Sequence, residues 1–252
     1  GHNLVPAPPA GTTAHSWLST AVGSRVMAGI FPYSASVRKV RFSDLLTDRL
    51  RTAPGNPLIT FYDDDTGERT ELSMTTYANW VAKTANVLLE DFDTEPGDRI
   101  RLTTGTHWLT PILLGATWLC GATVSAPGAN TGLLIGGPEC AADPQAIACS
   151  FHPFALAFPE PIRAHDFGSL WPSQPDVFLG NPDDATQVTC QSPSEARVIT
   201  DLDPATHPGL FLDLLRGGGS MVLVRNPDLT NWAATMATEK ATDSIRATDR
   251  PD

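Results

Sequence analysis

The chain has 252 residues, of which 41% are hydrophobic and 18% are charged, a balance that excludes an intrinsically disordered protein. This length allows one large α/β domain or two small ones. A net charge of −11 argues against nucleic acid as a partner, because phosphates require a basic surface. The sequence has no apolar run of about eighteen residues, so we expect no membrane span.

Residues 1–40 are rich in Pro, Ala, Ser and Thr, and we predict a flexible or loosely docked leader. The opening pair Gly1-His2 has no methionine before it, which is typical of a tag remnant or a processed end. No basic stretch precedes the weakly apolar part of this segment, which argues against a secretory signal. Residues 41–252 are predicted to form the folded domain.

The first regular elements follow the leader. Apolar spacing predicts an amphipathic helix over residues 42–50, with Ser43 or Asp44 as its cap. Residues 58–62 and 68–72 read as two strands of a hairpin at one side of a sheet. The Asp63–Gly67 segment between them could hold a hard cation, but a solvated turn is the favoured interpretation.

Residues 72–127 contain two successive helix–strand units. Ser73 is the predicted cap of a helix over residues 74–90, and a turn at residues 95–98 leads into a strand over residues 99–104. A second predicted helix, residues 108–119, is followed by a strand at residues 122–125. Such alternation is typical of a mostly parallel α/β sheet flanked by helices.

Many prolines occupy residues 128–184, so we predict loops and short elements there. Regular structure is predicted again as a strand at 198–200, a helix at 210–216, a strand at 221–224 and a helix around 229–236. Gly217-Gly218-Gly219 could suggest a phosphate loop, but a helix precedes it and a strand follows it. Phosphate loops need the reverse order, so we interpret these glycines as a helix C-cap. Residues 238–252 are polar and predicted to be frayed.

Several segments of this sequence, in this order, resemble the N-terminal part of the adenylate-forming superfamily, which includes acyl-CoA synthetases, peptide-synthetase adenylation domains and luciferases. These segments are Leu72-Ser-Met-Thr-Thr-Tyr77, Glu95-Pro-Gly-Asp-Arg-Ile100, Leu113-Leu-Gly-Ala-Thr-Trp-Leu-Cys-Gly-Ala-Thr-Val124 and Leu215-Arg-Gly-Gly-Gly-Ser-Met-Val-Leu-Val224. Together they cover most of residues 42–224. The resemblance implies a layered, mostly parallel α/β domain.

The family's phosphate loop, T-S-G-S-T-G-x-P-K-G, has its nearest counterpart in Val188-Thr-Cys-Gln-Ser-Pro-Ser-Glu-Ala-Arg197. In this register Thr189, Ser192 and Arg197 are compatible with phosphate binding. Gln191, Ser194 and Val198 stand where the family has glycines, and Glu195 adds a negative charge. A loop without glycines cannot bring its amides close to a triphosphate, so we predict that it does not hold ATP.

The resemblance places an adenine-binding region, a metal-binding step and a catalytic lysine domain beyond the counterpart of Val224. None is recognised in the residues that follow, so we expect no cofactor and no catalytic residue, with ATP, AMP and CoA as ligands to be tested. Two hypotheses stand. The first is a non-catalytic module that binds a small molecule or a protein partner. The second is an acyl- or nucleotide-binding enzyme component that a partner chain completes.

Other chemistry-bearing residues are fewer. Cys120, Cys140, Cys149 and Cys190 form no C-x-x-C pair, which argues against zinc and favours reduced thiols in a cytosolic protein. His165-Asp166 could be a catalytic dyad, but a surface or loop pair is favoured, since no G-x-S-x-G elbow accompanies it.

We expect any remaining ligand crevice at the carboxyl ends of strands, where open parallel sheets collect ligands. The candidates are Thr103, His107, Trp108 and His207. The last of these matches a family position that lines the acyl pocket. For His107-Trp108 the favoured interpretation is structural: a histidine at a helix start beside a tryptophan packed in the core.

Overall fold

The computed structural model describes residues 38–126, 128–129 and 131–249. The predicted leader lies outside these residues up to position 37, whereas the remaining positions of that segment, from Arg38, belong to a strand. The strands are β1 (Arg38–Arg41), β2 (Pro57–Asp63), β3 (Glu68–Ser73), β4 (Arg99–Leu102), β5 (Thr123–Val124), β6 (Leu133–Gly136), β7 (Ile147–Ala148), β8 (His165–Asp166), β9 (Gln187–Cys190), β10 (Arg197–Thr200), β11 (Ser220–Arg225) and β12 (Asp243–Ile245). The helices are α1 (Phe42–Thr52), α2 (Met74–Phe92), α3 (Leu109–Leu119), α4 (Phe167–Leu170), α5 (Pro208–Gly217) and α6 (Leu229–Thr238).

The strands form two five-stranded sheets and one two-stranded sheet. The first sheet has the order β12-β10-β11-β2-β3, and all its neighbours are parallel except the β2–β3 hairpin at its edge. The second sheet, β5-β4-β6-β7-β8, is parallel throughout. Antiparallel β1 and β9 form the small third sheet. The mostly parallel α/β fold and the edge hairpin predicted from the sequence are confirmed.

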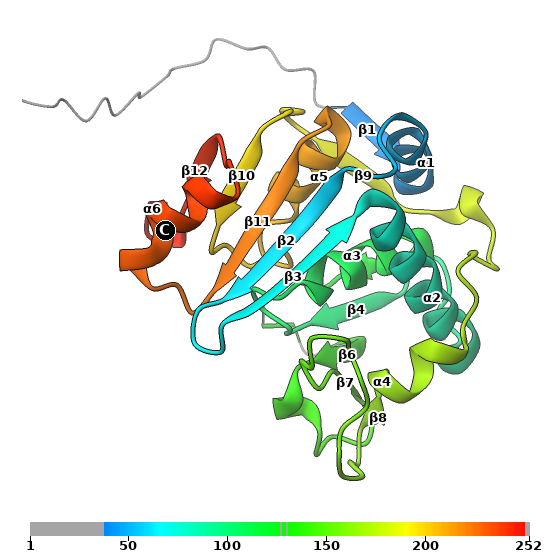
Figure 1. Ribbon diagram of the computed structural model, residues 1–252. Helices are drawn as coiled ribbons and strands as arrows, with labels where there is room; N and C mark the ends of the chain where they lie inside the picture. Colours follow the sequence, from blue (N-terminus) through cyan, green and yellow to red (C-terminus); the bar gives the residue numbers. More distant parts are fainter. Residues whose placement is uncertain (1–37, 127, 130, 250–252) are drawn as a thin grey trace, which may run out of the picture. The chain divides into compact units, whose positions relative to one another are not determined.

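Helices α2 and α3 lie between the two large sheets (Figure 1). Helix α2 packs on β2 and β3, α3 packs on β4 and β5, and the two helices pack on each other. All residues of α3 are buried, as expected for a helix covered on every side. Gly115 allows this close approach, because a Cβ there would lie 2.4 Å from the Tyr77 hydroxyl oxygen.

The N-terminal cap of α2 matches the sequence prediction, and that of α1 does not. Ser73 caps α2, since its hydroxyl accepts a hydrogen bond from the Thr76 amide at 3.1 Å. Helix α1 begins at Phe42 without a side-chain cap, so the prediction of Ser43 or Asp44 as its cap is wrong. The Ser43 hydroxyl instead donates to the Pro182 carbonyl at 2.8 Å, which ties α1 to the proline-rich segment.

The proline-rich segment forms loops and short elements, as predicted, and one buried side chain of α2 holds part of it. The Asn86 side-chain amide donates to the carbonyls of Pro175 and Val177, at 3.2 and 2.9 Å. Its oxygen accepts from the Leu179 amide at 2.9 Å. The buried Asn86 side chain thus satisfies backbone hydrogen-bonding groups of a loop that does not pair with a β-strand.

The residues after α6 are ordered up to residue 249, so the prediction of a frayed end is wrong for them. Strand β12 pairs in parallel with β10 and extends the first sheet. Glu239 is buried and its carboxylate contacts Arg69 and Arg197, at 2.9 and 2.6 Å. Because these partners lie on β3 and β10, a polar sequence is held in place by contacts that are distant along the chain. Within residues 38–126, 128–129 and 131–249, no helix is both long and apolar enough to cross a bilayer.

Candidate functional site

The predicted counterpart of a phosphate loop, residues 188–197, comprises the end of β9, the connecting segment 191–196 and the first residue of β10. The Gln191 amide donates to the Asp213 carboxylate at 2.7 Å, and the Ser194 amide donates to the Asp213 carbonyl at 3.0 Å. The Ala196 amide donates to the Ser194 hydroxyl at 3.1 Å, and Pro193 has no N–H. These amides are therefore bonded inside the protein, mostly to α5.

Two glycines at the end of α5 let this segment pack directly on the helix. A Cβ on Gly217 would lie 2.1 Å from the Ser194 nitrogen, and one on Gly219 would lie 2.4 Å from the Ala196 oxygen. Between them, Gly218 has φ +98° and forms the left-handed C-cap of α5. The interpretation of these glycines as a C-cap is confirmed, and their small size has the second role of admitting residues 194–196.

The three candidate phosphate-binding residues do not lie together: Thr189 and Arg197 belong to two different sheets, and Ser192 lies in the loop between them. Thr189 is on β9 opposite Lys39 of β1, and Ser192 is exposed just beyond that strand. Arg197 begins β10 in the first large sheet, and its guanidinium donates to Glu239 at 2.6 Å and to the Thr60 hydroxyl at 2.9 Å. The Arg197 side chain thus holds β2, β10 and the end of α6 together.

A crevice of about 260 Å³ lies at the carboxyl end of β4. Thr103, Ser125, Asp203 and Thr206 are among the residues that line it. The Thr206 hydroxyl and His207 Nδ1 are 2.9 Å apart, so the imidazole contacts a lining residue without itself lining the crevice. Burial raises the pKa of Asp203, although the Ala205 amide that bonds its carboxylate opposes this effect.

His107 and Trp108, the other two crevice candidates, are buried in the core. The His107 ring stacks on Phe151, with centroids 4.2 Å apart, and its Nδ1 accepts from the Leu109 amide at 3.2 Å. Its Nε2 has no hydrogen-bond partner among the described residues. Trp108 packs edge-on against Trp80. Both residues therefore have the core placement expected from the structural interpretation of the sequence. Of the four candidates, only Thr103 lines the crevice, and His207 is next in sequence to the lining residue Thr206.

We expect His107 to stay neutral throughout the physiological pH range. Burial, reinforced by the charge of Arg225, lowers its pKa to about 3. The unfolded chain takes up a proton near pH 6.5, but the folded chain does not, so stability should fall as the pH drops from 6.5 towards 3. The slope is at most about 1.4 kcal/mol per pH unit for this group.

NMR titration checks this expectation. The imidazole resonance that disappears in His107→Gln should keep its chemical shift down to about pH 4. The exposed His165→Gln serves as the assignment control and should leave that resonance in place. A midpoint between pH 6 and 7 would contradict the prediction.

The remaining motifs have structural roles. The Asp166 carboxylate accepts from the Phe158 and Gly168 amides, both at 2.9 Å, and so caps α4. His165 packs edge-on against Phe92 and is exposed, as expected for a surface residue, but the pair forms the short strand β8 and not a loop. The Asp63–Gly67 segment is a turn, closed by a 2.8 Å bond from the Gly67 amide to the Asp63 carbonyl. Among the described residues, no three His, Cys, Asp or Glu side chains are grouped so as to hold a metal ion.

All four cysteines are buried free thiols. Burial raises the pKa of Cys120 to about 12 and also raises the pKa of Cys149. Both thiols are therefore poor nucleophiles at neutral pH.

No protein-family model matches the chain. A "TIGR03089 family protein" of Mycobacterium tuberculosis (strain ATCC 25618 / H37Rv) is 28% identical over 230 residues, which cover 79% of this chain and 95% of that protein. Among solved structures, acetoacetyl-CoA synthetase from Streptomyces lividans matches with a TM-score of 0.60 and 15% identity, over 84% of this chain and 43% of that one. The Brucella canis acyl-CoA synthetase matches with a TM-score of 0.59 and 14% identity, over 82% and 47%.

The chain thus spans about half the length of the solved structures that it matches. At this level of identity the likeness concerns the fold, and it agrees with the layered sheets described above. Over the matched residues, the chain has the fold of a part of acyl-CoA synthetases and related ligases, in agreement with the resemblance found in its sequence.

Proposed function

We propose that this chain is a non-catalytic small-molecule-binding or interaction module built on the scaffold of an acyl-CoA synthetase, and that it does not activate substrates with ATP. The observation that carries the proposal is the use of the amides of Gln191, Ser194 and Ala196 within the protein. A phosphate loop must direct such amides at the anion. Glu195, exposed in the same segment, would also repel a triphosphate.

Reorganising this segment would be costly. The Gly219 amide donates to the Ser194 carbonyl at 3.0 Å, and Gly217 and Gly219, at and just after the end of α5, are in close contact with residues 194 and 196. To face a ligand, the segment would have to give up these bonds and this packing together. The geometry therefore favours a scaffold role over nucleotide activation.

The ligand of the module is assigned to the crevice beside Thr103. Its volume of about 260 Å³ is below the usual range of drug-sized pockets, so it suits a compact molecule. Thr103, Ser125 and Asp203 offer hydroxyl and carboxyl groups. A small molecule with several hydrogen-bonding groups is the class that these side chains would recognise.

Calorimetry and an exchange assay test the absence of ATP activation. ATP–pyrophosphate exchange with a panel of carboxylic acids should stay at background, and titration with ATP–Mg should show no binding tighter than about 1 mM that Thr189→Val abolishes. The Streptomyces lividans acetoacetyl-CoA synthetase, assayed in parallel, is the positive control. Exchange that is lost in Thr189→Val would overturn the proposal. Exchange that requires a second protein would support the enzyme component completed by a partner chain.

A further inference from the structure

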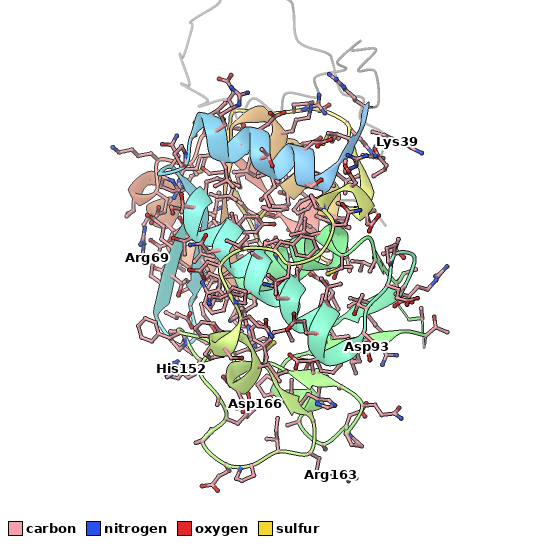
Figure 2. All side chains as sticks on the ribbon, turned by 90° about the vertical axis from the view of Figure 1, so that its right-hand side faces the viewer. Lys39, Arg69, Asp93, His152, Arg163 and Asp166 are labelled. Atoms are coloured by element: carbon pink, nitrogen blue, oxygen red, sulfur yellow. The ribbon has the colours of Figure 1, made fainter. Side chains whose placement is uncertain are left out.

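We propose that a second cavity, separate from the crevice beside Thr103, binds a phosphorylated organic compound. This arginine pocket has a volume of about 590 Å³ and lies between α1, α5 and β1. Its lining includes four arginines, Arg38, Arg49, Arg51 and Arg216, and one acidic residue, Asp48. In Figure 2, α1 is the blue helix at the top of the domain, and Lys39, next to Arg38, projects beside it.

This concentration of positive charge is unusual in an acidic chain. The whole sequence has 28 acidic and 17 basic residues, yet four arginines meet around this cavity. Asp48 offsets only Arg51, from which it lies 3.6 Å away on the exposed face of α1. Among the described residues, Arg38, Arg49 and Arg216 have no carboxylate within ion-pair distance. Residues 1–37 contain no Asp or Glu, so that segment has no side-chain carboxylate to offer either.

Arg49 is the buried part of the pocket. Its residue is 8% exposed, and Nη2 donates to the carbonyls of Gly218 and Gly219, at 2.7 and 3.1 Å. These bonds cap α5, but Nε is buried without a hydrogen-bond partner among the described residues. A buried cation with an unused N–H carries an unfavourable desolvation energy, which a neighbouring anion would offset. The cap alone therefore accounts for only part of this guanidinium's donors.

The pocket's chemistry points to the class of ligand. Guanidinium groups recognise phosphate through paired N–H donors, and several of them favour a group with more than one negative charge. Val40, Leu45 and Leu215 add apolar surface to the same lining. The cavity volume is within the range of small-molecule sites. Charged and apolar lining together fit a phosphate attached to an organic body.

The test uses the full chain and two probes, pyrophosphate and fructose 1,6-bisphosphate, in calorimetry at low salt. We expect saturable binding of the bisphosphate that weakens by at least about tenfold in Arg38→Gln/Arg216→Gln, because two charge-assisted contacts are removed. The matched control is Arg99→Gln/Arg163→Gln, which makes the same change of charge at two exposed arginines outside the pocket lining. Its affinity should stay within about twofold of the unmodified chain.

The variants also separate this inference from the proposed function. Arg38 and Arg216 form no ion pair among the described residues, and the hydrogen bond between Arg216 and the Cys190 thiol is a weak one, so their substitution should change the thermal midpoint little. ATP–Mg binding that disappears in the arginine variants, without pyrophosphate exchange, would belong to this pocket and leave the proposed function intact. No saturable binding of either probe, or binding that both double variants weaken equally, would overturn the inference.

Discussion

Replacing Glu239 by glutamine should lower the free energy of unfolding by about 3 kcal/mol, because two arginines then lose a buried charged partner. The Glu239 carboxylate contacts Arg69 and Arg197 and accepts from the Tyr62 hydroxyl at 2.5 Å. These residues come from β2, β3 and β10, so one side chain joins three strands to the end of α6. Urea unfolding followed by circular dichroism measures the loss.

The pH dependence of this contribution has a definite sign. Burial by itself raises the pKa of Glu239, but hydrogen bonds from Tyr62, Arg197 and Arg69 outweigh it, so the pKa lies below its ordinary value of 4.5. The stabilisation should be complete above pH 4.5 and should be lost as the pH falls through the pKa of the folded state. The exposed Glu195→Gln is the matched control, and we expect its unfolding energy to change by less than about 0.5 kcal/mol. Equal effects of the two substitutions would contradict this account.

The second large effect is expected at Gly217, where alanine should destabilise the protein by about 2–3 kcal/mol. Its Cβ would lie 2.1 Å from the Ser194 nitrogen and 2.4 Å from the Ser194 oxygen, so the backbone of residues 194–196 must move away from α5. Thermal unfolding measures the loss. Faster amide hydrogen exchange at Ser194 would report the displacement of the segment.

Gly209 provides a control in the same helix. A Cβ there meets nothing within 4 Å, and alanine favours helix over glycine by up to about 1 kcal/mol. Gly209→Ala should therefore leave stability unchanged or raise it. If Gly217→Ala were equally harmless, residues 191–196 would not be held against α5 as described, and the support for the proposed function would weaken.

Local sequence patterns predicted the elements between residues 57 and 125 well, because each has its own periodicity and its own turn. Ser73 is an example: a serine before an apolar helical pattern is a signal that needs no information from elsewhere in the chain. Predictions were wrong where distant contacts decide the structure. Glu239 belongs to a polar stretch without periodicity, and its partners on β3 and β10 become visible only in the fold.

The residues of the candidate site were likewise predicted correctly only in part. The rule that ligands gather at the carboxyl ends of parallel strands led to Thr103, which lines the crevice. The same rule also pointed to His107 and Trp108, but both residues are only 1% exposed and belong to the core. The rule concerns the position of the backbone and does not say which way a side chain points. Nor could it find the arginine pocket, because Arg38, Arg49 and Arg216 are separated along the sequence and meet only when α1 packs on α5.

The order of strands in the first sheet has a consequence for how the chain folds. Strand β2 lies between β3 and β11, and Ile59 pairs with Met221 across most of the domain's length. During synthesis the β2–β3 hairpin is therefore complete long before its parallel neighbour has left the ribosome, and one apolar edge stays open in the meantime. Because β2 and β11 are far apart in the sequence, we expect slow folding. Until β11 pairs with β2, the exposed strand edge can also lead to aggregation.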